Sequence, residues 1–285
     1  MNNKNWSFPG VLIRFAALSV IGLGGCFQLD PAGSEDLARG AASAGTVTAA
    51  DRLHPPSATV AQAAGRNPPS SLSDGERERR RKVSQVMAFY RIQSGMTVLD
   101  LYSDGGYYTE QLSSVVGHSG RVVAYNKRPD QRLTGVEIEN PYAEGRFPNV
   151  EVILNEDGQL DLPPGTFDLV LMIQVLHDIY AGSEVGGGPS VANTLAEIYR
   201  SMRPGAVLGI VDHVAAKGAP ASTGGTLHRL DPGLIKRDVT AAGFLFDGES
   251  DVLRNFDDDY TQPVFNESIR GRSDRIVLRF RKPVR

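Results

Sequence analysis

Hydrophobic positions along the chain form short continuous runs that alternate with runs at helical spacing. Five apolar runs are expected to be strands: TVLDLY (97–102), RVVAYN (121–126), VEVIL (150–154), FDLVLMI (167–173) and VLGIVDH (207–213). Helices are expected in GERERRRKVSQVMAFYRI (75–92), with its Arg and Glu residues as a solvated first turn, and at 107–116, 136–146, 191–202 and 232–242. Nearly continuous apolar strands separated by helices indicate a parallel sheet that is covered by helices on both faces.

The end of the chain breaks this alternation. The segments FLFDGESDVL (244–253) and DRIVLRFRKP (274–283) are both strand-like, and no helical pattern separates them. Two strands joined without a crossover helix pair in antiparallel fashion. The sequence therefore predicts an α/β fold with a mostly parallel, seven-stranded sheet that ends in an antiparallel hairpin.

The first 26 residues have a different pattern. An apolar run, Phe15–Gly25, follows Lys4 and Arg14, and it is shorter than the roughly 20 residues that a membrane span needs. Such a run suits the hydrophobic region of a secretory signal. It ends in LGGC, which resembles the lipobox of bacterial lipoproteins, so the resemblance implies cleavage before Cys26 and acylation of that cysteine, for example with palmitate.

The segment from Phe27 to Ser73 is rich in Ala, Gly, Ser, Thr and Pro and lacks a sustained apolar period. We expect a flexible tether here, because such a composition buries too little surface to offset the entropy of ordering. The predicted organisation is a signal peptide at 1–26, a tether at 27–73 and a domain at 74–285. A lipid on Cys26 would place this domain on a membrane of the bacterial cell envelope, facing the periplasm or another extracytoplasmic space.

Charge and composition exclude some partners. The chain of 285 residues has 30 Lys plus Arg against 33 Asp plus Glu, a net charge of -3. Without a basic excess, a nucleic-acid partner is not expected. The apolar share of 41% suffices for one large core, and contact with a membrane is expected through the lipid anchor only. Nothing in the sequence indicates an oligomeric state.

The stretch VLDLYSDGGYYTEQLS (98–113) has the outline of a nucleotide-binding turn, with an apolar strand, a small-residue loop and a helix start. From Asp74 to Pro283 the order of such segments resembles class I methyltransferases that depend on S-adenosylmethionine (SAM). The resemblance implies that Asp100 and the loop through Tyr102, Asp104, Gly105 and Gly106 bind the cofactor. Tyr102 and Asp104 stand where this family usually has glycine.

Two further segments fit the same resemblance. Asn126 ends the second strand where the family has an acid that binds both ribose hydroxyls, so one amide oxygen replaces a carboxylate. Asp157, with Asp161 next, stands where a loop acid recognises adenine. Pro204 and Gly205 are expected to form the turn before the fifth strand. Motifs such as GGYYTE, LHDIY and LHRLDP also resemble a group of exported bacterial methyltransferases in which an aromatic residue at position 102 is usual.

Histidines follow two of the predicted parallel strands. His177 and Asp178 come after the fourth strand, Asp212 and His213 end the fifth, and His228 lies in a later loop. Ligands bind beyond the carboxyl ends of such strands, so these residues are expected at one crevice. His177 is the preferred general base for methyl transfer, oriented by Asp178 or Asp212, while His213 and His228 position a small-molecule substrate.

Other interpretations of these residues stay open. The histidines and acids could cap strands and satisfy loop backbone groups, or they could bind a divalent metal ion, although no tight HxH or HxxxH spacing supports a metal. The glycine-rich segment 182–190 is either a lid or an insertion. The alternative function is a lipid-anchored binding protein that keeps the fold without transferring methyl groups.

Overall fold

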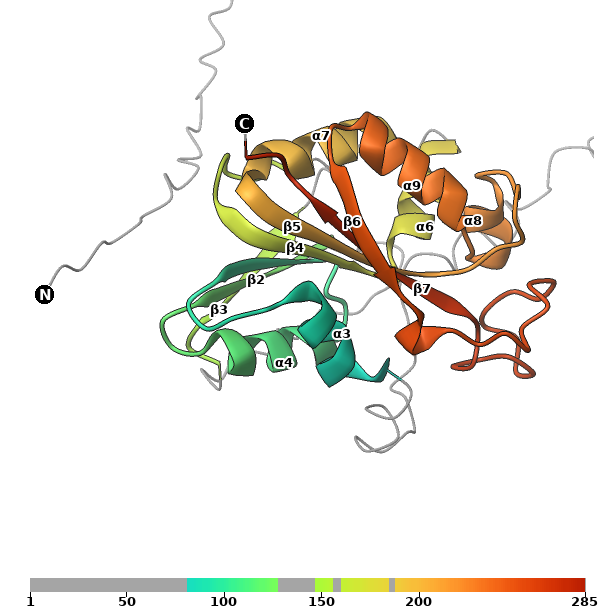
Figure 1. The fold of residues 1–285 in the computed structure, drawn as a ribbon, viewed down its shortest axis with the longest axis horizontal. Coiled ribbons are helices and arrows are strands. Elements are labelled where there is room, and N and C mark those ends of the chain that lie inside the picture. Colours follow the sequence, from blue (N-terminus) through green and yellow to red (C-terminus); the bar gives the residue numbers. More distant parts are fainter. Residues whose placement is uncertain (1–80, 128–146, 156–159, 185–187, 285) are drawn as a thin grey trace, which may run out of the picture. The chain divides into compact units, whose positions relative to one another are not determined.

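The computed structural model describes residues 81–127, 147–155, 160–184 and 188–284 (Figure 1). All of them belong to the second of two compact units, Pro55–Arg285. The predicted signal peptide with Cys26, the tether, the helix at 136–146 and Asp157 lie outside the described residues.

A seven-stranded sheet forms the centre of the domain, in the order β3-β2-β1-β4-β5-β7-β6. The strands are β1 (Thr97–Leu101), β2 (Arg121–Lys127), β3 (Val150–Asn155), β4 (Phe167–Ile173), β5 (Met202–His213), β6 (Leu245–Ser250) and β7 (Arg275–Arg281). The first five strands pair in parallel, and β7 lies antiparallel between β5 and β6. The predicted fold class is therefore confirmed.

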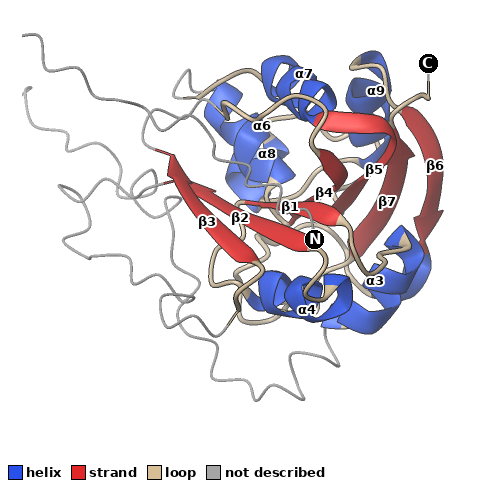
Figure 2. Ribbon diagram, turned by 90° about the vertical axis from the view of Figure 1, so that its left-hand side faces the viewer, coloured by secondary structure: helices blue, strands red, loops and turns tan. Residues whose placement is uncertain are grey.

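Helices cover both faces of the sheet (Figures 1 and 2). One face holds α3 (Val83–Tyr90) and α4 (Tyr107–Val116), and the other holds α6 (Leu176–Glu184), α7 (Val191–Ser201), α8 (Thr223–Leu227) and α9 (Pro232–Ala241). A short 3-10 helix, η1 (Asp251–Leu253), follows β6. Among the described ranges, none of these helices combines the length and hydropathy that a bilayer crossing requires.

Local sequence explains where two of the helices start. Ser190 caps α7 by accepting a hydrogen bond from the Asn193 amide, and Asp231 caps α9 by accepting one from the Gly233 amide. Pro232 follows as the first residue of α9, where its missing N–H costs nothing. Leu195 and Ile198 of α7, like Ile235 and Val239 of α9, then point into the core beneath the sheet.

Three segments differ from the sequence prediction. α6 and α8 were not predicted, because the large apolar residues of α6 are Leu176, Ile179 and Tyr180 alone and α8 is five residues long. The predicted loop 182–190 begins inside α6. The predicted turn at Pro204–Gly205 is wrong: both residues lie within β5, where the register shifts by a bulge between the pairs Phe167–Met202 and Leu169–Val207.

Candidate active site

The loop that follows β1 keeps the backbone of a glycine-rich turn without all of its glycines. Tyr102, Asp104 and Gly106 have φ angles of 56, 50 and 77°, all in the left-handed region that glycine adopts most easily. A Cβ added at Gly105 would meet no atom within 4 Å, so that side of the loop is open. The positions that the resemblance assigned to glycine are thus positions where the backbone favours glycine.

Asn126 holds this loop from the end of β2. Its Oδ1 accepts a hydrogen bond from the Asp104 amide at 2.9 Å, and its Nδ2 donates to the Ser103 hydroxyl, also at 2.9 Å. The amide nitrogen is therefore engaged, while the oxygen keeps a second lone pair. Replacing the usual acid with Asn exchanges one acceptor for a donor that ties the loop to the sheet.

Asp100 lies beneath the loop and not at its surface. Its side chain is buried, with 1% exposure for the residue, and accepts a hydrogen bond from the Thr109 hydroxyl of α4 at 2.6 Å. Burial raises the pKa of this carboxyl to about 6, although the Thr109 hydrogen bond acts to lower it. The structure thus places Asp100 where it fixes the start of α4. Of the adjacent tyrosines, Tyr108 packs inward and Tyr107 lies under Arg81.

His177 and Asp212 form a buried pair at the carboxyl ends of β4 and β5. Nδ1 of His177 lies 2.7 Å from Oδ1 of Asp212, and the backbone N–H of His177 donates to Oδ2 at 3.0 Å. Burial acts to lower the pKa of His177, but the carboxylate of Asp212, helped by Asp178, outweighs it and raises the pKa. Asp212 is fully buried, and it is the acid that fixes the His177 ring.

His213 lies next to this pair, but its ring is engaged inside the protein. Its Nε2 is 3.0 Å from the Gln174 amide nitrogen and its Nδ1 is 2.8 Å from the Ser273 hydroxyl. Burial, with the charge of His177, lowers the pKa of His213 well below its usual range. These contacts leave neither ring nitrogen for a substrate, and sequence reasoning missed both Gln174 and Ser273.

His228, the residue after α8, lies next to Asp178 and His177. Its Nδ1 lies 3.5 Å from Oδ1 of Asp178, which is itself 3.5 Å from Nε2 of His177. The rings of His177 and His228 meet edge to face with centroids 5.3 Å apart. A Cβ at Gly224 of α8 would lie 2.7 Å from the His177 carbonyl oxygen, so this glycine permits the close approach of α8 to α6.

The motif around His228 fixes its position. Arg229 is fully buried, and its guanidinium donates to both carboxylate oxygens of Asp258 at 2.8 and 3.1 Å. The same group donates to the carbonyl oxygens of Val214 and Gln262. Arg229 therefore anchors the loop that presents His228.

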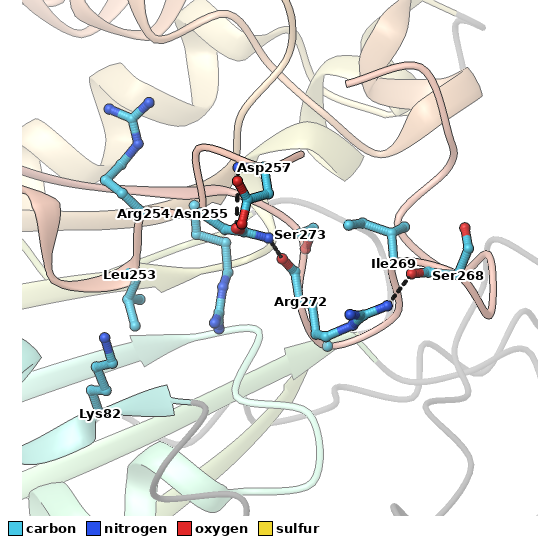
Figure 3. A pocket seen from close by; sticks show the side chains of 11 residues that line it. Lys82, Leu253, Arg254, Asn255, Asp257, Ser268, Ile269, Arg272 and Ser273 are labelled. Atoms are coloured by element: carbon cyan, nitrogen blue, oxygen red, sulfur yellow. Dashed lines mark hydrogen bonds between the residues drawn. The ribbon is translucent and has the colours of Figure 1, made fainter. Parts of the chain in front are cut away.

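A cavity of about 480 Å³ lies between Lys82, the segment 253–257 and the segment 268–275 that leads into β7 (Figure 3). Ser273, whose hydroxyl contacts His213, is one of its lining residues. Lys82, Arg254, Arg272 and Arg275 supply four basic side chains to the wall, against the single acid Asp257. Arg254 is neutralised by its hydrogen bonds to Asp274, but the balance stays positive. The size is that of a small-molecule site.

The structure thus brings together most of the residues that the sequence singled out beyond β4 and β5. His177, Asp178, Asp212 and His228 form one cluster, with His213 at its side. Tyr102, Asp104, Gly105, Gly106 and Asn126 form the loop region, in which Tyr102 packs edge to face on Tyr125. Asp161, the second adenine candidate, is exposed with a φ of 39°.

Residues 114–210 match a family model described as a methyltransferase domain. The match begins within α4, after the altered loop, and runs into β5. The strand order and the antiparallel end of the sheet agree with this match. Residues 114–210 are thus similar to a methyltransferase domain, and the sheet around them has the class I methyltransferase fold. This finding supports the prediction of a methyltransferase that uses SAM.

Solved structures agree with this fold. A SAM-dependent methyltransferase from Aquifex aeolicus is 21% identical, with a TM-score of 0.52 over 73% of this chain and 93% of that one. The (4+2)-cyclase SpnF is 16% identical, with a TM-score of 0.51 over 72% and 81% of the two chains. A Haloferax volcanii complex of the Trm112 activator with a putative methyltransferase has a TM-score of 0.51, 16% identity and 74% and 95% coverage. No curated protein matches the sequence.

Proposed function

We propose that the protein is a SAM-dependent methyltransferase that acts on a small, negatively charged acceptor. The observation that carries this proposal is the meeting of two features at the carboxyl edge of one sheet. The left-handed loop Tyr102–Gly106 follows β1, and the His177–Asp212 pair lies beyond β4 and β5. In open α/β sheets, this edge is where ligands bind.

The cofactor fits the first of these features. The open side of Gly105 allows a ligand to approach the loop backbone, and the free lone pair of Asn126 Oδ1 can accept a ribose hydroxyl. When bound there, SAM would supply the electrophilic methyl group. Asp104 is exposed at the loop tip, where its charge favours the amino or sulfonium end of the ligand over its carboxylate.

The acceptor fits the second feature. The cavity beside Ser273 is large enough for a small molecule, and its excess of basic side chains favours an anion. Arg275, one of these basic side chains, is the first residue of β7. His177, whose Nδ1 is bound to Asp212, presents Nε2 as the atom that activates the acceptor. In this arrangement, His177 and Asp212 act together.

Calorimetry with SAM and S-adenosylhomocysteine on the full-length chain in detergent tests this function. We expect both ligands to bind in the micromolar range. Gly105→Leu should abolish binding, because its side chain would occupy the open side of the loop without meeting protein atoms. Gly182→Leu is the matched control, since Gly182 of α6 also faces open space but lies away from the loop.

Absence of binding for both ligands at millimolar concentration would overturn the proposal. It would favour the alternative of a binding protein. The fold is compatible with that alternative, because the cyclase SpnF has a similar fold and is named for a different reaction. Binding that survives Gly105→Leu would place the cofactor elsewhere. If SAM binds, the acceptor can be found by adding fractions of anionic small molecules and measuring which of them leads to formation of S-adenosylhomocysteine.

We also propose that the domain is attached to a membrane of the bacterial envelope by a lipid on Cys26. The support is the sequence alone: an apolar run after Lys4 and Arg14 that ends in LGGC. Cys26→Ser should abolish labelling with radioactive palmitate and release the protein from the membrane fraction. An unchanged membrane fraction for this variant would contradict the anchor without touching the proposed activity.

A further inference from the structure

We propose that His177, Asp178 and His228 form a binding site for a divalent transition metal ion of the Zn²⁺ type. Two imidazoles and one carboxylate come together from α6 and from the residue after α8. Imidazole nitrogen and carboxylate oxygen are donors that such ions prefer. The proposal adds a metal to the proposed methyltransferase and rests on that function only for the ion's role, not for its binding.

The distances between the three donor atoms suit a shared ion. Oδ1 of Asp178 lies 3.5 Å from Nε2 of His177 and 3.5 Å from Nδ1 of His228. All three donors lie within 4.8 Å of one another. Ligand bonds of about 2.0–2.1 Å at tetrahedral angles put donors about 3.4 Å apart, which the two pairs through Asp178 already match, while the two ring nitrogens lie within 4.8 Å of each other and would close around an ion. The same separation is too long for hydrogen bonds between them.

The surroundings of His177 match those of a metal-bound histidine. Its Nδ1 is 2.7 Å from the buried carboxylate of Asp212, which fixes the tautomer with the lone pair on Nε2. The backbone N–H of His177 donates to the other oxygen of the same carboxylate, so the ring and the main chain are held together. Nε2 is therefore directed at Asp178 by a rigid support.

His228 provides an independent observation. Its Nδ1 is buried and, among the residues that the structure describes, has no hydrogen-bond partner. The residue adopts a left-handed φ of 56° and its ring packs edge to face on Phe265. Arg229, fixed by Asp258, holds the adjacent backbone. A buried nitrogen that is held in place without a partner is explained if it ligates an ion.

The donor set leaves room for a reacting group. His213 does not complete the set, because both its ring nitrogens contact Gln174 and Ser273. Three protein ligands with an open position are typical of catalytic zinc sites. An ion held there would bind an oxygen of the acceptor and lower its pKa, so the acceptor would lose its proton to water before it attacks the methyl group. His177 would then activate the acceptor as a ligand.

Zinc binding to the full-length chain, purified in detergent and stripped with a chelator, tests the site. We expect one Zn²⁺ per chain by calorimetry, with micromolar or tighter affinity, and a Co²⁺ complex with visible absorption typical of low coordination number. His228→Ala and Asp178→Asn should each weaken Zn²⁺ binding at least tenfold. Both residues are partly exposed, which favours folding of the variants.

The matched control is His118→Ala, which removes an exposed histidine between α4 and β2 and should leave Zn²⁺ affinity unchanged. The proposal is overturned if the chain binds no stoichiometric Zn²⁺, or if both site variants bind it as the unmodified chain does. Titration of the metal-free chain with SAM keeps the two proposals separate. SAM binding without Zn²⁺ binding would contradict the metal site alone and leave His177 as the proposed base. Zn²⁺ binding without SAM binding would contradict the methyltransferase proposal alone.

Discussion

The carboxyl edge of the sheet has two halves that are built in different ways. Beyond β1 and β2, the backbone of a short loop sets the geometry, and the amide of Asn126 ties it down through two hydrogen bonds. Beyond β4 and β5, buried charged side chains set the geometry, with Asp212 at the centre. A site made by backbone tolerates side-chain changes, whereas a site made by buried charges does not.

This contrast explains why the altered residues lie on the loop side. Tyr102 and Asp104 depart from the glycines that the family usually has, yet both adopt the left-handed conformation that those glycines would adopt. By contrast, the Asp212 carboxylate has three specific partners, the His177 ring, the His177 amide and the His213 amide. We therefore expect substitution of the buried groups around Asp212 to lower the free energy of unfolding more than side-chain substitutions in the loop do.

Asp212→Ala should have the largest effect. It removes a fully buried carboxylate that accepts hydrogen bonds from the His177 ring, the His177 amide and the His213 amide. Leaving such donors unpaired should lower the free energy of unfolding by about 4 kcal/mol. Urea denaturation measures this change. Asp178→Ala is the control, because Asp178 also contacts His177 but is half-exposed, and it should cost under about 1 kcal/mol. Similar losses for both variants would show that burial of the carboxylate is not the cause.

Asp100→Asn tests the one buried charge on the loop side. The pKa of Asp100 is raised to about 6, so its stabilising contribution is present below the unfolded pKa of 3.8 and is lost as pH rises through about 6. Asn keeps an acceptor for Thr109 and carries no charge. We expect the variant to be more stable by up to about 3 kcal/mol at pH 8, since each pKa unit corresponds to about 1.4 kcal/mol.

The same variant should show almost no gain near pH 3.5, where the folded carboxyl is neutral and the unfolded one, with a pKa of 3.8, is about two-thirds neutral. Thermal unfolding at the two pH values therefore provides an internal control. A gain that does not change with pH would mean that the charge of Asp100 is not the cause.

Gly224→Ala tests how closely α8 must approach α6. The new methyl group would lie 2.7 Å from the His177 carbonyl oxygen, which is backbone and cannot turn aside. We expect a loss of about 1.5 kcal/mol in unfolding free energy, as is usual for overpacking, and weaker Zn²⁺ binding through displacement of His228. Gly225→Ala, which meets only the Ala181 methyl at 3.3 Å, should do neither. Calorimetry and denaturation on both variants decide the point.

Asn126 substitutions should have the smallest effect. Asn126→Ala removes both hydrogen bonds to the loop, and a loss of about 1 kcal/mol corresponds to SAM affinity about fivefold weaker. Asn126→Asp keeps an acceptor for the Asp104 amide and can accept from the Ser103 hydroxyl, so its SAM affinity should equal or exceed that of the unmodified chain. Weaker binding by Asn126→Asp than by Asn126→Ala would show that the amide N–H, not the acceptor, matters.

The sheet could be predicted because its strands are short, apolar and separated by clear helical patterns. The antiparallel end followed from the absence of a helix between the last two strands, and the register of β7 between β5 and β6 bears this out. The bulge at Pro204–Gly205 could not be predicted, because Pro and Gly also mark an ordinary turn. α6 was missed because its large apolar residues cover a single helical turn.

The candidate site could be predicted only where strand ends define it. The proximity of His177 and Asp212 follows from the rule that neighbouring parallel strands end at one edge. The partner of His213, Ser273, lies 60 positions away and arrives through the start of an antiparallel strand, which no local pattern reveals. Likewise, Gly224 shows its role only once α8 is seen against His177.

The place of β7 in the sheet affects when the protein can fold. This strand is the last in the chain, yet it lies between β5 and β6, and Ser273 immediately before it supports His213. During synthesis, β6 therefore emerges without the neighbour it pairs with, and neither the sheet nor the histidine cluster can be completed until almost the whole chain is available. Until β7 is made, the edges of β5 and β6 that it pairs with stay open, and a folding intermediate with open strand edges is prone to aggregate.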